Sequence, residues 1–80
     1  MKLNILTFGI ARDIVGGNEF EVEIAQGANI ADLKSYLTNA YPEFARLASF
    51  AIAVDEAYRA DDFVLEQGSE VVIIPPVSGG

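Results

Sequence analysis

Four consecutive apolar residues, 71–74, run directly into two prolines, Pro75 and Pro76. An apolar residue at every position is typical of a strand in the middle of a sheet, buried on both faces. Proline fixes φ and has no N–H for a sheet ladder, so this strand has to stop where the prolines begin. The sequence therefore predicts that the chain leaves a central strand as an extended tail over residues 75–80.

The predicted tail continues with small residues, namely Val77, Ser78, Gly79 and Gly80. Glycine has no Cβ, so its backbone can pass through a channel that is too narrow for side chains. A frayed end would also be rich in small residues, but fraying does not require a rigid Pro-Pro directly after an apolar strand. We therefore expect the tail to deliver the carboxylate of Gly80 into the active site of another protein.

The chain contains neither cysteine nor histidine. Disulfides and zinc–thiolate sites are excluded by the missing cysteines. Ser-His-Asp and Cys-His arrangements are excluded as well, and no imidazole can act as an acid or base near pH 7. Any reaction must therefore use the terminal carboxylate or groups that a partner supplies. We expect this chain to bind no metal and no cofactor of its own.

Charge restricts the class of partner. Twelve acidic and five basic residues give a formal net charge of −7. Nucleic acids and anionic membranes would repel such a chain, which leaves a protein with a basic face as the natural partner. The sequence shows no secretory signal and no apolar run near the roughly 20 residues of a membrane span. We therefore expect a cytoplasmic protein.

The hydrophobic pattern predicts a sheet. Its first strand is apolar on both faces, which favours an interior position, and we expect it to form a hairpin with the second strand, whose glutamates face water. A later strand alternates large residues with alanines, which suits close packing under a neighbouring element. The predicted strands are 3–8, 20–24, 50–54, a short one near 58–59, and 71–74.

Of two segments between the predicted strands, one is interpreted as a loop and the other as a helix. The segment 11–18 contains charged residues and two glycines, so we interpret it as a loop or wide turn. In contrast, Asn29 is a good helix N-cap with Asp32 three residues later, and apolar residues recur at helical spacing from Ile30 onward. Pro42 disfavours helical geometry in the residue before it, so we expect the helix to end near residue 41.

Eighty residues, 51% of them apolar, suffice for one domain with a single core. The predicted order is strand, strand, helix, strand, short strand, strand. This is an α+β pattern in which one main helix packs on one face of a four- or five-stranded sheet.

The chain resembles a known protein family. Three stretches support the resemblance: 6–16 (LTFGIARDIVG), 68–71 (GSEV) and the ending 75–80 (PPVSGG). Together with the order of elements, they are similar to the small subunit of molybdopterin synthase, often called MoaD, in the MoaD/ThiS group of ubiquitin-like β-grasp sulfur carriers. The chain differs from that pattern at Asp55 and Ser69, two turn positions where Asp, Asn and Ser interchange.

The resemblance implies a function for the tail. An ATP-dependent, ubiquitin-activating-type enzyme would adenylate the carboxylate of Gly80, and sulfur would then replace AMP to leave a thiocarboxylate. The tail would enter the large synthase subunit, in a complex that is usually a heterotetramer, and donate sulfur to the cyclic pyranopterin monophosphate precursor. ATP would bind the activating enzyme, because Gly16-Gly17 lacks the Lys-Ser/Thr of a phosphate-binding loop.

The resemblance also implies roles for single residues. Gly80 would be the reacting residue and Gly79 would provide clearance, while Val77 and Ser78 would line the path of the tail. Pro75 and Pro76 would restrict the tail and so reduce the entropy lost on docking. Two further residues, Phe8 and Arg12, are candidates for the partner surface, although Phe8 could equally belong to the core.

Three alternatives remain open from the sequence. The thiamin-pathway sulfur carrier shares the fold and the terminal glycines and differs in its acceptor. A ubiquitin-like modifier would instead form an isopeptide bond to a target lysine. A binding module that docks a partner through its sheet or acidic face would have no use for its two terminal glycines.

Overall fold

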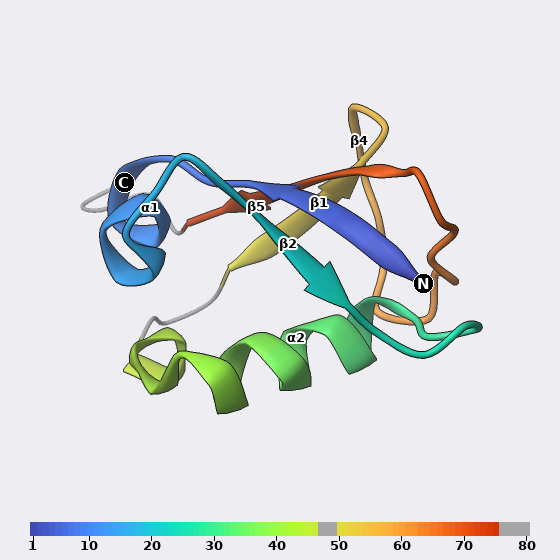
Figure 1. Cartoon of the computed structure of the whole chain (residues 1–80), viewed down its shortest axis with the longest axis horizontal. Coiled ribbons are helices and arrows are strands. Elements are labelled where there is room, and N and C mark those ends of the chain that lie inside the picture. The colour runs from blue at the N-terminus through green and yellow to red at the C-terminus, as the bar shows by residue number, and fades with distance from the viewer. Residues whose placement is uncertain (47–49, 76–80) are drawn as a thin grey trace.

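The computed structural model describes residues 1–46 and 50–75. It contains five strands, two α-helices and one 3₁₀ helix within these residues (Figure 1). In order they are β1 (Lys2–Leu6), α1 (Gly9–Val15), β2 (Glu19–Glu23), α2 (Ile30–Ala40), the 3₁₀ helix η1 (Pro42–Arg46), β3 (Ala51–Val54), β4 (Ala57–Tyr58) and β5 (Glu70–Ile74).

The five strands form one mixed sheet in the order β2-β1-β5-β3-β4. β1 and β5 run parallel to each other, with Ile5 opposite Val71, and the other pairs are antiparallel. The first and last described strands are therefore neighbours in the interior of the sheet. This arrangement is a ubiquitin-like β-grasp fold, as predicted, and β1 and β2 pair as expected.

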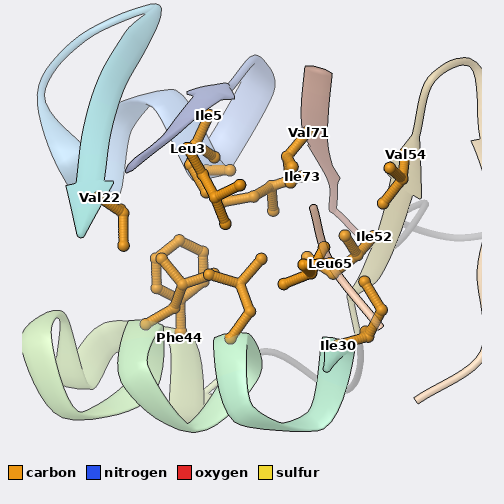
Figure 2. Close-up of a cluster of buried hydrophobic side chains, with 13 residues drawn as sticks. Leu3, Ile5, Val22, Ile30, Phe44, Ile52, Val54, Leu65, Val71 and Ile73 are labelled. Atoms are coloured by element: carbon orange, nitrogen blue, oxygen red, sulfur yellow. The ribbon is translucent and has the colours of Figure 1, made fainter. Parts of the chain in front are cut away.

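The core lies between the sheet and α2 (Figure 2). Every second residue of β1, β3 and β5 faces the helix, as the period of a strand requires. Phe44 of η1 closes one end of the core and contacts Phe50 and Tyr41 through ring packing. The buried apolar residues of this cluster are Leu3, Ile5, Ala11, Val22, Ile30, Leu33, Leu37, Phe44, Ile52, Val54, Leu65, Val71 and Ile73.

α2 begins and ends where local signals predict. The Asn29 side chain accepts a hydrogen bond from the Asp32 N–H (2.9 Å), and the Asp32 carboxylate accepts one from the Asn29 N–H (3.0 Å). This reciprocal pair is a capping box, with Asp in the place of the usual Glu or Gln. At the other end the Tyr41 N–H still reaches the carbonyl of Leu37, and Pro42 starts the 3₁₀ helix.

The predicted loop over 11–18 is wrong in its first half, because residues 9–15 form helix α1. Ala11 is buried, and Ile14 and Val15 are partly buried, so these three residues form a short apolar face at helical spacing. Gly16, interpreted as a turn residue, ends this helix with φ of 84°, and its N–H donates to the carbonyl of Arg12. The glycine is a left-handed C-cap.

The prediction for residues 71–74 is half correct. β5 is central, as expected, but it is buried on only one face: Val71 and Ile73 face α2, whereas Val72 and Ile74 are partly exposed. Within 1–46 and 50–75, no helix covers the face that Val72 and Ile74 occupy (Figure 1). A continuous apolar run therefore did not mean burial on both sides here.

Candidate functional site

The root of the tail lies at the end of β5. Ile74 still pairs with Ala51 of β3, and the strand stops there, as the prolines predicted. Pro75 is partly buried, and a Cβ built on Gly9 would lie 3.6 Å from its Cγ. Pro75 therefore packs against the first residue of α1. The remaining predicted tail residues, Pro76, Val77, Ser78, Gly79 and Gly80, lie outside the described residues.

Phe8 and Arg12 lie at the same end of the sheet as Pro75. Phe8 directly precedes Gly9 and is 47% exposed, so it belongs to the surface and not to the core. The Arg12 N–H donates to the carbonyl of Phe8 (3.4 Å), which places the exposed Arg12 one helical turn further on. Ile10, which the sequence analysis did not single out, is 48% exposed beside them.

The sheet face opposite α2 carries a row of apolar residues that the ladder registers align. Leu6 pairs with Val72, Val72 with Ala53, and Ala53 with Tyr58. We call Leu6, Val72, Ala53 and Tyr58 the apolar row. Tyr58 is 70% exposed, and Leu6 and Val72 are partly exposed. This row crosses four strands, and the Ile74–Ala51 pair at the root of the tail lies beside it along β5 and β3.

The apolar row could not be found from the sequence alone. The alanines of β3 suggested close packing under another element, but they lie on the uncovered face with Ala53 only 7% exposed. Only the pairing of strands that are distant in sequence shows that Leu6, Val72 and Tyr58 share one row.

An acidic border flanks the apolar row on the β2 side. It consists of Glu19, Glu21 and Glu23, which are all exposed, as the alternation in β2 predicted. Glu19 pairs across the ladder with Leu6, so the border begins directly beside the row. The Asn4 amide donates to the Glu19 carboxylate (3.1 Å) and fixes that side chain on the same face. The open face therefore combines an apolar centre with a negatively charged edge.

The buried polar side chain of the described part, Thr7, has a structural role. Thr7 is 5% exposed, and its hydroxyl donates to the carbonyl of Gly17. The Thr7 N–H also donates to the carbonyl of Asn18 (2.8 Å). These two hydrogen bonds connect the end of β1 to the segment before β2, and they hold α1 between the two strands.

The described residues contain neither a cluster suited to a metal ion nor a helix suited to span a membrane. No three Asp or Glu side chains in 1–46 and 50–75 lie together so that they could hold a metal ion. In the same ranges, no helix has the length and hydropathy that would be needed to span a bilayer.

Comparison with known proteins gives a consistent picture. The model of the ThiS family matches residues 5–80. The sequence is 34% identical to the molybdopterin synthase sulfur carrier subunit of Chlamydomonas reinhardtii, with 100% of both chains covered. It is 32% identical to the subunit of the same name from Caenorhabditis briggsae, over 100% of this chain and 99% of that one.

Solved structures agree in fold. A chain from Pyrococcus furiosus, provisionally assigned as subunit 1 of a molybdopterin converting factor, superposes with a TM-score of 0.88 at 28% identity, covering 96% of this chain and 99% of that one. The small archaeal modifier protein 1 of Haloferax volcanii gives 0.82 at 18% identity (95% and 98% covered). The complex of subunits 1 and 2 of the Helicobacter pylori molybdopterin-converting factor gives 0.68 at 21% identity, with 100% of both chains covered. The last two show a common fold.

Proposed function

The chain belongs to the ThiS family, and from this premise we propose that it is the sulfur carrier subunit of a molybdopterin synthase. The observation that supports this most directly is that relatives at 34% and 32% identity, matched over the whole chain, are both sulfur carrier subunits of that enzyme. The enzyme activity belongs to the complex. This chain would supply the sulfur atom and position it.

The reaction begins at the carboxylate of Gly80. A free carboxylate is a poor acyl donor because its oxygen is a poor leaving group. Attack of this carboxylate on the α-phosphorus of ATP, with release of pyrophosphate, gives an acyl-adenylate whose AMP can be displaced. A sulfur nucleophile at the oxidation level of sulfide then attacks the carbonyl carbon, the bond from that carbon to the AMP oxygen breaks, AMP leaves with the electron pair, and the sulfur stays as a thiocarboxylate. ATP and the catalytic groups would belong to the activating enzyme.

The second half of the cycle takes place in the large subunit of the synthase. The thiocarboxylate would enter its active site and transfer sulfur to a cyclic pyranopterin monophosphate. Two such transfers are needed to form the dithiolene of molybdopterin. Cations that bind the phosphate of this substrate would come from the large subunit, because the chain described here is strongly acidic.

The folded part would aim the tail and hold the partner. Pro75 packs on Gly9, so the direction in which the chain leaves β5 is restricted before docking. The apolar row offers a contact surface next to that exit, and Phe8 and Arg12 extend it at the same end of the sheet. The large subunit and the activating enzyme would both have to approach this end to reach Gly80.

The test is intact mass before and after treatment with a thiol-alkylating reagent. The chain is incubated with ATP, a sulfur source and the matching activating enzyme. Because the chain contains no cysteine, alkylation that maps to Gly80 reports a thiocarboxylate. We expect one alkylation per chain. Unalkylated protein, with the same enzyme active on a control carrier, would contradict the proposal.

A chain extended by one residue after Gly80 is the matched control. It should keep the fold and lose alkylation, because the reacting carboxylate is displaced from its place in the activating enzyme. The thiamin-pathway alternative is separated by which large subunit co-purifies. A ubiquitin-like modifier, which shares this fold in the Haloferax volcanii protein named above, would leave covalent adducts of higher mass on denaturing gels.

A further inference from the structure

The outer edge of β2 has backbone groups whose direction the ladder with β1 determines. Met1 and Ile24 exchange two hydrogen bonds, from the Ile24 N–H to the Met1 carbonyl (2.9 Å) and from the Met1 amine to the Ile24 carbonyl (2.7 Å). At the other end the Thr7 N–H donates to the Asn18 carbonyl (2.8 Å). In an antiparallel ladder, hydrogen-bonded and non-hydrogen-bonded pairs alternate. The residues of β2 that bond to β1 are therefore Phe20 and Val22.

It follows that Glu19, Glu21 and Glu23 form the non-hydrogen-bonded pairs. Their N–H and C=O groups point away from β1, toward the free edge of the sheet. The same three residues form the acidic border, and their side chains lie on the open face. An additional strand could pair with this edge. Along β2, the N–H and C=O groups that it would bond to all belong to exposed glutamates.

This combination discourages pairing between two copies of the chain. If two β2 edges paired antiparallel about Glu21, each glutamate would lie opposite another at a Cα separation of about 5.5 Å. Like charges directly opposite are destabilising. A strand with Lys or Arg at every second position would instead place a cation opposite each carboxylate. The charge of the edge therefore disfavours a second copy of β2 and favours a basic strand.

We propose that the β2 edge pairs with an extended basic segment of the large subunit, which adds a sixth strand to the sheet; the choice of partner rests on the proposed function. The edge lies two strands from β5, about 10 Å at ordinary strand spacing. Leu6 pairs with both Glu19 and Val72, so the Glu19 end of the edge is on the side from which the tail leaves. One partner can therefore reach the edge, the apolar row and the tail together.

Amide hydrogen exchange tests the pairing directly. The large subunit encoded in the same genome is mixed with the full chain, and complex formation is checked by native mass. In the free chain the amides of Glu19, Glu21 and Glu23 face solvent and should exchange fast, whereas those of Phe20 and Val22 are bonded to β1. In the complex we expect the three glutamate amides to slow by at least about tenfold. A complex in which they exchange as in the free chain overturns this inference alone.

Two substitutions separate the backbone contribution from the charge. Glu21→Thr keeps the N–H and removes the charge, whereas Glu21→Pro also removes the N–H, which the ladder to β1 does not use. We expect Glu21→Pro to weaken the complex by about tenfold more than Glu21→Thr, the value of one or two hydrogen bonds. Glu66→Thr, an equal loss of charge in the turn before β5, should bind as the wild type does.

The remaining outcomes test either the pairing at the β2 edge or the proposed function. Equal binding by Glu21→Pro and Glu21→Thr shows that the edge makes no backbone pairing and overturns the inference. If Glu21→Pro does not fold, the exchange measurement on the wild-type complex decides alone. If no complex forms at all, the proposed function fails, and with it the occupant named here.

Discussion

Gly9, at the start of α1, is held to glycine by its backbone angle. Its φ is 60°, in the left-handed region, and its missing Cβ would lie 3.6 Å from Cγ of Pro75. That separation is an ordinary van der Waals contact, so space alone does not require glycine at this position. The backbone angle does, because L-residues with a side chain rarely adopt it.

At this residue scale we predict that Gly9→Ala lowers the free energy of unfolding by about 1–2 kcal/mol through backbone strain. Urea denaturation followed by circular dichroism measures the change. Gly17→Ala is the matched control, because Gly17 has no positive φ and its added Cβ would lie 3.8 Å from the carbonyl oxygen of Glu19. Equal losses in both variants would contradict the role assigned to φ.

Single residues differ in how far the sequence predicts them. Pro75 was predictable because the end of β5 follows from its own ring geometry. Phe8 was not, because an aromatic residue after an apolar strand fits a core and a surface equally well. Its exposure depends on Gly9 turning the chain into α1, and that turn has no distinct local signal.

At the scale of elements, α2 is stabilised by its own sequence, whereas α1 is stabilised by contacts with the rest of the fold. α2 has eleven residues, a capping box and an apolar stripe, and all three features can be recognised in its own sequence. α1 has seven residues and no side-chain cap at Phe8, so little in its own sequence stabilises it. It forms because Ala11 is buried against the rest of the fold and because the Thr7 hydrogen bonds hold its ends together. Such tertiary support was not visible in the sequence.

The cap of α2 gives a prediction at this scale. Asn29→Ala removes the acceptor for the Asp32 N–H and should lower the free energy of unfolding by about 0.5–2 kcal/mol. Thermal and urea unfolding measure the loss. Asn29→Asp keeps an acceptor at the same place and should stay close to the wild type. If Asn29→Asp lost as much stability as Asn29→Ala, the capping bond would not be the cause.

At the scale of the whole molecule, the two faces of the sheet differ in polarity. One face is covered by α2 and forms the core (Figure 1), and the other carries the apolar row, which runs from the acidic border across to β4. The order of elements along the chain was enough to predict the β-grasp fold. The uncovered face was not predictable, because it depends on the parallel pairing of β1 with β5, which are distant in sequence.

The apolar row gives the prediction for the whole molecule. Val72→Glu places a charge in the middle of the row and should weaken binding to the large subunit by at least about tenfold, because a buried interface charge without a partner is costly. Val72 is partly exposed, so the melting temperature should change little. Calorimetric titration measures the binding.

Ser35→Glu is the matched control for that variant. It adds the same charge on the exposed side of α2, on the opposite face of the molecule, and should bind the large subunit as the wild type does. Equal weakening in both variants would show that net charge, and not the open face, governs the association.

The central position of β5 also has a consequence for synthesis on the ribosome. β5 is the last strand in chain order, yet it joins the β1–β2 pair to the β3–β4 pair. Until residues 70–74 have emerged, a nascent chain can form at most the β1–β2 and β3–β4 pairs, with no shared sheet between them. Closing the sheet is therefore a late event that requires contacts between distant parts of the chain, and such contacts form slowly. A chain that ends before β5 would lack both the tail and the strand that completes the core. We therefore expect such a truncated chain to stay unfolded and to be degraded in the cell.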